Sequence, residues 1–231
     1  MFTGEACGRL TGVTLLDWLA SLPPGERDAA VEDHLGIAAE PPSSTPPGDH
    51  LVGYHASGVA PIVRMLVEVP VVADDVVVDL GAGLGKVPML TRLLTGATAR
   101  GIELQPALVA RAREAARRAG LDVGFTDGDA RDAYLDDGTV FFLYVPFTGP
   151  VLAEVLRRLR TVASRRAIVV CSLGIELDRE APWLARRPLD SFWLTIYDSL
   201  APEVPSRPPR LRSPISGRAA EAIASERPAG L

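Results

Sequence analysis

A cluster of glycines directly after a short apolar run is the feature that most limits what this chain can fold into. Residues 76–80 read Val-Val-Val-Asp-Leu and are followed by Gly-Ala-Gly-Leu-Gly at 81–85. A continuous apolar run of this length is typical of a parallel strand buried on both faces. Glycines let the backbone pass close to a ligand, and the N-terminus of a following helix presents free amides. The pattern therefore predicts a strand, a ligand-binding loop and a helix that starts near residue 85.

Strand-like and helix-like segments alternate between residues 51 and 200. We expect strands at 76–80, 98–103, 122–126, 140–144, 167–171 and 191–197. Between them we expect helices at 57–68, 85–94, 107–119 and 150–159, with Ser57 as the cap of the first. This alternation of strands and helices predicts an α/β fold in which helices cover both faces of an open parallel sheet.

The chain divides into three stretches. Residues 1–50 hold a short apolar cluster, a helix that runs from Pro24 to Gly36, and a linker at 40–48 that is rich in proline and serine. Residues 51–200 form the α/β domain. Residues 201–231 form a tail with five arginines and three glutamates, which is either a solvated, partly disordered segment or an arm packed on the domain.

Composition excludes several classes of protein. The 231 residues carry a net charge of −5, which argues against a nucleic-acid partner held by bulk electrostatics. Two distant cysteines and three scattered histidines predict neither a disulfide framework nor a metal site. There is no apolar run of about 18 residues and no signal-like start, so we expect no membrane span and a cytoplasmic location. A single lysine among many arginines suggests a bacterial source.

An acidic residue lies at the end of each of the first two expected strands. Asp79 lies two residues before the first glycine, and Glu103 lies 18 residues beyond Gly85 at the end of the second strand. An acid at that point can accept hydrogen bonds from both hydroxyls of a ribose and repels a 2′-phosphate. The glycine spacing is G-x-G-x-G, whereas dinucleotide-binding loops have G-x-G-x-x-G. A nicotinamide-dependent oxidoreductase is therefore a disfavoured alternative.

This order of motifs over residues 54–200 resembles the class I S-adenosylmethionine-dependent methyltransferases. The resemblance implies a Rossmann-like, seven-stranded, mostly parallel sheet with helices on both faces, preceded by a small helical N-terminal extension. It also implies S-adenosylmethionine as the cofactor. The core, with Gly53-Tyr54 and Gly101-Ile-Glu103, is loosely similar to the non-SET histone lysine methyltransferases.

The resemblance implies a set of cofactor-binding residues. Asp79 and the loop glycines would hold the amino-acid end, Glu103 the ribose, and Asp129 with Ala130 the adenine, for which Asp127 is a less favoured choice. The full set is Tyr54, Asp79, Gly81, Gly83, Gly85, Glu103, Leu104, Asp129, Ala130 and Tyr144.

The fourth strand ends in Phe142-Leu-Tyr-Val-Pro-Phe147. The resemblance implies that this segment contacts both the cofactor and the methyl acceptor. Tyr144 and His55 are the candidate catalytic residues, since a histidine titrates near neutrality and can take a proton. His55, Pro146 and Phe147 are the candidate acceptor contacts. Tyr54 and His55 either close over the cofactor or pack the N-terminal piece onto the sheet. A valine at 145 replaces the polar amide of amino-group methyltransferases, which argues against base or glutamine methylation.

Several other residues have a structural and a functional interpretation. Lys86 is either a solvated residue in the first turn of a helix or a charge partner for Asp79, Glu103 or a substrate acid. Cys171 is expected to be a small buried apolar residue. The aromatic residues Trp183, Trp193 and Tyr197 either pack the last strands or wall a substrate cavity.

The sequence thus predicts an S-adenosylmethionine-dependent methyltransferase with a small-molecule or peptide acceptor, no metal and no nucleic-acid partner. The alternative is a catalytically silent protein that has the same fold and works as a cofactor-binding scaffold through partners. The sequence carries no signal for an oligomeric state.

Overall fold

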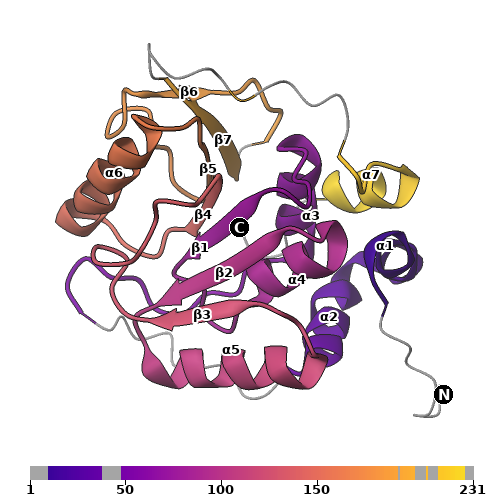
Figure 1. The fold of residues 1–231 in the computed structure, drawn as a ribbon. Coiled ribbons are helices and arrows are strands. Elements are labelled where there is room, and N and C mark those ends of the chain that lie inside the picture. Colours follow the sequence, from indigo (N-terminus) through magenta and orange to yellow (C-terminus); the bar gives the residue numbers. More distant parts are fainter. Residues whose placement is uncertain (1–9, 38–47, 192, 201–206, 208–212, 227–231) are drawn as a thin grey trace.

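A computed structural model describes residues 10–37, 48–191, 193–200, 207 and 213–226. Its centre is a seven-stranded sheet in the order β3-β2-β1-β4-β5-β7-β6 (Figure 1). The strands are β1 Val76–Leu80, β2 Thr98–Glu103, β3 Gly124–Asp127, β4 Val140–Tyr144, β5 Val169–Leu173, β6 Leu184–Arg186 and β7 Leu194–Ser199. The first five pair in parallel, and β7 runs antiparallel to both β5 and β6. The predicted Rossmann-like, seven-stranded, mostly parallel sheet is confirmed.

The strand order reverses at β1, which lies between β2 and β4. Asp79 of β1 is in register with Gly101 of β2 on one side and with Phe142 of β4 on the other. The connections from β1 and β4 leave in opposite directions, so a crevice opens at the carboxyl ends of these two strands. That position is the usual ligand site in open α/β sheets.

Helices cover both faces of the sheet, but unevenly (Figure 1). They are α1 Gly12–Ser21, α2 Arg27–Leu35, α3 Val59–Glu68, α4 Lys86–Thr95, α5 Pro106–Ala119, α6 Gly149–Ala163 and α7 Arg218–Ala224, with a 3₁₀ turn, η1, at Pro24–Glu26. One apolar core joins α1 to α5 and α7 to one face, and a second joins α6 to the other. Adjacent residues of β1 divide between them, Val77 in the first core and Val78 in the second, as strand alternation requires.

The N-terminal helices and α7 pack together on the α3 and α4 side of the sheet. Leu15, Leu16 and Leu19 of α1 are fully buried, and α7 contacts both α1 and α3. Arg27 at the start of α2 forms an ion pair with Glu226, which follows α7. Of the two alternatives for the tail, residues 213–226 have the packed arrangement. The predicted linker lies almost entirely outside the described residues.

Some expected helix and strand ends are wrong. The helix predicted from Ser57 begins at Val59, and its first amide donates to Asp28 Oδ1 of α2 at 2.8 Å, so the capping side chain comes from another helix. The third and fifth strands begin two residues later than expected, and the short strand β6 was not predicted. In the part of the chain that the structure describes, no helix combines the length and the apolarity needed to cross a membrane.

Candidate functional site

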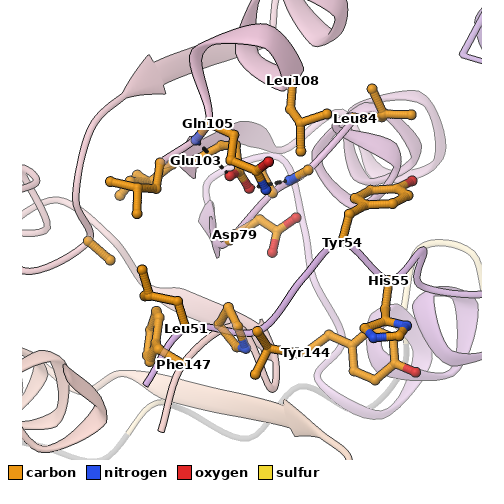
Figure 2. A pocket seen from close by; sticks show the side chains of 18 of the residues that line it. Leu51, Tyr54, His55, Asp79, Leu84, Glu103, Gln105, Leu108, Tyr144 and Phe147 are labelled. Carbon is orange, nitrogen blue, oxygen red and sulfur yellow. Dashed lines mark hydrogen bonds between the residues drawn. The ribbon is translucent and has the colours of Figure 1, made fainter. Parts of the chain in front are cut away.

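A cavity opens at the carboxyl ends of β1, β2 and β4 (Figure 2). It is lined by all but one of the residues that the sequence singled out for cofactor or acceptor binding: Tyr54, His55, Asp79, Gly81, Gly83, Glu103, Leu104, Asp129, Ala130, Tyr144, Pro146 and Phe147. The exception is Gly85. A Cβ on this glycine would lie 2.4 Å from Cζ of Phe125, so Gly85 lets α4 pack closely against β3 and does not border the cavity.

The loop between β1 and α4 passes close to its neighbours because it lacks side chains. Gly81 and Gly83 both have positive φ angles, 91° and 53°. A Cβ on Gly81 would lie 2.4 Å from Cβ of Pro146, and a Cβ on Gly83 would lie 2.5 Å from Cε2 of Tyr54. Glycine is therefore required at both positions, by conformation and by space.

Asp79 lies in the middle of the cavity with its carboxylate directed into it (Figure 2). The side chain is 3% exposed, and none of the described residues gives it a hydrogen bond. Burial, and secondarily the charge of Glu103, raise the pKa of Asp79 well above its ordinary value. A buried acid without a partner is costly, and such groups mark sites where a ligand supplies the missing partner.

Glu103 is held rigidly at the end of β2. Its Oε2 accepts the backbone N–H of Gly83 at 2.9 Å, and its Oε1 accepts the N–H of Gln105 at 2.9 Å. The side chain is 8% exposed and borders the cavity. Because a carboxylate oxygen can accept two hydrogen bonds, Glu103 keeps acceptor capacity for a ligand.

Tyr54 closes one side of the cavity against the glycine loop. Burial raises the pKa of Tyr54 to about 12, and the nearby carboxylates of Glu32 and Glu103 add to the shift. The segment before it is tied to the loop after β4, since Val52 donates to the carbonyl of Pro146 at 3.0 Å and Leu51 bridges to Phe147. Residues 51–57 therefore cross the ends of the strands.

The structure separates the two candidate adenine acids. Asp129 borders the cavity, whereas Asp127 is exposed and does not. Both carboxylate oxygens of Asp129 accept hydrogen bonds from Arg131, which lowers the pKa of Asp129. Ala130 lies next to it, buried at the cavity wall.

The end of β4 brings the two candidate catalytic residues together. The rings of His55 and Tyr144 lie 6.4 Å apart between centroids, and His55 is exposed (Figure 2). Burial raises the pKa of Tyr144, so its hydroxyl stays protonated at neutral pH. Val145 has a φ of 36°, which is a strained conformation for a β-branched residue. Such strain concentrates at functional sites.

The solvated interpretation of Lys86 is wrong, and so is its pairing with Asp79 or Glu103, whereas pairing with a substrate acid stays a prediction. The side chain is 5% exposed, so it is not solvated, and its partners are neither Asp79 nor Glu103. Its Nζ lies 2.5 Å from Glu32 Oε1 and 3.2 Å from Asp28 Oδ1, both on α2. The sequence could not reveal this pairing, because it depends on how the N-terminal helices fold back over α4.

A second cavity adjoins the first and shares Ala56, Lys86 and Tyr144 with it. Its volume is about 320 Å³. The remaining walls come from distant parts of the chain: Pro24, Gly25, Arg27, Asp28, Glu32, Gly58, Val59, Ala60, Pro61, Leu173 and Glu226. Sequence reasoning missed these residues, since they follow no motif and meet only in the folded protein.

The other singled-out residues border neither of these two cavities: Cys171, Trp193 and Tyr197 are buried, and Trp183 is half-buried against the core that includes α6. Burial raises the pKa of Cys171 to about 12, as expected for a buried thiol. Tyr197 is fully buried, donates to Asp178 and accepts from the amide of Leu177. Trp193 packs in the core beneath Arg64. These aromatic residues therefore have the packing role.

Comparisons with known proteins find methyltransferases. Residues 77–165 match the sequence model of a methyltransferase domain family. The crystal structure of an RNA methyltransferase from Salinibacter ruber in complex with S-adenosyl-L-homocysteine is 30% identical, with a TM-score of 0.51. That alignment covers 65% of this chain and 97% of the other.

A second similar structure comes from work on the conversion of a disulfide bond into a thioacetal group during echinomycin biosynthesis. It is 18% identical, covers 62% of this chain and 83% of the other, and has a TM-score of 0.52, which shows a shared fold. No curated protein matches the chain.

The geometry fits the cofactor of these proteins. Gly81 and Gly83 border the cavity with backbone alone, and the buried Asp79 lacks a hydrogen-bond partner among the described residues. Together with a relative of 30% identity that is covered almost completely, these features show that the chain belongs to the S-adenosylmethionine-dependent methyltransferases of Rossmann-like fold.

Proposed function

We propose that this enzyme methylates an oxygen or nitrogen atom of a small-molecule or peptide acceptor. The observation that carries the proposal is the meeting of the two cavities at Tyr144, beside His55. One cavity holds the three acids expected to contact the cofactor, and the other leaves space for an acceptor on the far side of Tyr144. A volume of this size suits a small molecule or a peptide side chain.

The proposed cofactor contacts follow the chemistry of each residue. Asp79 balances the ammonium of the amino-acid end, which supplies the partner that its buried carboxylate lacks. Glu103 accepts from the ribose hydroxyls with the lone pairs that the amides of Gly83 and Gln105 leave free. Asp129 and Ala130 face the adenine, and Tyr54 covers the glycine loop.

The proposed catalytic roles are to align the acceptor and to remove its proton. When bound, the cofactor supplies an electrophilic methyl group. The enzyme has to align the acceptor behind that methyl and exclude water. Tyr144, protonated at neutral pH, donates a hydrogen bond that orients the acceptor atom. His55 takes the proton that the acceptor loses.

RNA is the second candidate acceptor, because the similar protein from Salinibacter ruber is described as an RNA methyltransferase. The net charge of −5 argues against it, since most of the affinity for RNA comes from phosphate contacts with lysine and arginine.

Transfer of radiolabelled methyl from S-adenosylmethionine tests these alternatives. Small-molecule pools, peptide pools and total RNA are incubated in parallel with the wild-type protein. Label in the first two pools supports the proposal, and label in RNA alone overturns it in favour of the second candidate. Binding of S-adenosylhomocysteine without transfer to any pool would favour the silent scaffold.

The proposed role of His55 as the general base is tested with the variant His55→Gln. The matched control is His50→Asn, which changes a histidine outside both cavities. We expect His55→Gln to lower kcat by about 100-fold, because the acceptor then loses its proton without a positioned base, and to leave the affinity for S-adenosylhomocysteine unchanged. A kcat equal to that of the wild-type protein would remove His55 from the mechanism.

A further inference from the structure

We propose that the second cavity is the acceptor pocket and that it selects a primary amine over an anion. This inference rests on the proposed function, since it names the acceptor group for that site. It assigns a binding role to residues of α2 and to Glu226, which lie outside the Rossmann-like core.

The cavity has the position that an acceptor pocket requires. It reaches the ends of β4 and β5 through Tyr144 and Leu173, and it touches the first turn of α4 through Lys86. It shares Ala56, Lys86 and Tyr144 with the cofactor cavity. An acceptor bound there would therefore lie next to the cofactor, and the N-terminal helices would form its outer wall.

Both cations of the pocket are already paired with carboxylates of the protein. Arg27 donates through Nε to the carbonyl of Leu19 at 2.7 Å and through Nη2 to that of Leu22 at 3.0 Å, and its Nη1 pairs with Glu226. Lys86 is shared between Asp28 and Glu32. An incoming phosphate or carboxylate would therefore have to compete with carboxylates that already hold these two side chains.

The carboxylates of the pocket are only partly engaged. Asp28 Oδ1 accepts from both Lys86 and the amide of Val59, and Glu32 Oε1 pairs with Lys86. Within the described ranges, no hydrogen bond reaches Asp28 Oδ2 or Glu32 Oε2. Asp28 Oδ2 lies near Gly58, another wall residue, 3.5 Å from where a Cβ would be.

The pocket thus offers carboxylate oxygens, Asp28 Oδ2 and Glu32 Oε2, that can accept hydrogen bonds from a ligand. Three carboxylates face two cations, so the pocket keeps a net negative charge. An ammonium group satisfies both the free lone pairs and the charge, whereas an anion would be repelled. Proline, valine and leucine side chains on the remaining walls suit an apolar body attached to the amine.

Small probes of matched shape test this without knowledge of the natural acceptor. Benzylamine, benzyl alcohol and benzoate are titrated into the full chain saturated with S-adenosylhomocysteine, with binding followed by ligand-observed NMR. Nα-acetyl-lysine methylamide is added as a fourth probe, to separate a peptide amine from a small free amine. We expect either amine to bind about fivefold or more tightly than benzoate.

Substitutions in and outside the second cavity test whether the amine probes bind there. Ala60→Phe fills the cavity from α3 and is expected to abolish amine binding without changing the affinity for S-adenosylhomocysteine, while Ala107→Phe on the surface of α5 is the control. Glu32→Gln is expected to weaken amine binding by several-fold and to leave benzyl alcohol unaffected. Glu26→Gln, on the same segment but outside the pocket, should change neither.

Each outcome decides the matter. Benzoate binding as tightly as the amines, amine binding that survives Ala60→Phe, or no binding of any probe would overturn the inference. These results do not depend on turnover, so they are distinct from a failure of the proposed function, which is an absence of methyl transfer to every small-molecule and peptide pool.

Discussion

At the scale of single residues, the site is built from acids in unequal environments. The carboxylate of Asp79 is buried and has no hydrogen bond from the described residues, Glu103 accepts two backbone amides, and Asp129 is paired with Arg131. The three carboxylates therefore differ in how much they need a ligand. Asp79 has the most to gain from binding, because the ionised form of its carboxylate has no partner among the described residues to offset its burial.

We expect the substitution Asp79→Asn to have opposite effects on stability and on cofactor binding. Its folded-state pKa lies above the unfolded value, so the native state binds more protons, and stability falls as pH rises from about 4 through the folded-state pKa. Asp79→Asn should remove that fall and raise the Tm of the ligand-free protein at neutral pH. It should also abolish stabilisation by S-adenosylhomocysteine. Thermal melts between pH 4 and 8, with and without S-adenosylhomocysteine, measure both; a lower Tm for the ligand-free variant would contradict the argument.

We expect substitution of Glu103 to lower the affinity for S-adenosylhomocysteine, and substitution of a nearby exposed acid to leave it unchanged. Glu103→Ala should weaken S-adenosylhomocysteine binding at least about tenfold, because hydrogen bonds to a charged group contribute roughly 1.5–3 kcal/mol. Asp127→Asn, at the end of β3 but outside the cavity, should leave it unchanged. Calorimetric titration, with NAD in parallel, makes the comparison. Equal affinity for NAD would argue against the cofactor assignment.

At the scale of elements, α4 is bounded by two glycines with similar φ angles and different surroundings. Gly85 has φ 81° and Gly96 has φ 71°. A Cβ on Gly85 would lie 2.4 Å from Phe125, whereas a Cβ on Gly96 would meet no atom within 4 Å. Gly96→Ala should cost about 1–2 kcal/mol of unfolding free energy for the backbone alone. Gly85→Ala should cost about 2–5 kcal/mol, because overpacking is added. Urea unfolding of both variants measures the difference, and equal losses would show that space at Gly85 is irrelevant.

The elements also show where sequence reasoning succeeds and where it stops. Strands β1 and β4 were predicted to the residue, because each is a buried apolar run bounded by a glycine or a proline. Strand β6 has three residues, too few to show a pattern. The cofactor cavity was predictable because its residues follow the ends of consecutive strands. The second cavity was not, since Asp28 and Glu32 on α2 reach Lys86 only through tertiary packing.

At the scale of the whole molecule, the two ends of the described chain close over the same side of the sheet. Helix α7 packs on α1 and α3, and Glu226 pairs with Arg27 at the start of α2. The wall of the second cavity therefore depends on contacts between residues about 200 positions apart. Stability of the N-terminal helices should be coupled to that of α7.

That coupling is measurable by hydrogen exchange. Ile223 is fully buried in α7, so Ile223→Ala should cost about 2–5 kcal/mol. Exchange should become faster in α1 and α7 together, while α6 on the opposite face keeps its protection. Glu221→Ala, an exposed change on the same helix, is the control. Faster exchange confined to α7 would show that the terminal segments open independently.

The buried position of Lys86 allows its chemical reactivity to be used as a measure of motion at the border of the two cavities. Lys86 is the sole lysine of the sequence, and its amine is enclosed by α2. Acylating reagents that target lysine therefore have one internal site, at the border of both cavities, where Asp28 and Glu32 hold its amine. The rate of acylation at Lys86, read by mass spectrometry, then measures how often this amine is released from its two carboxylates.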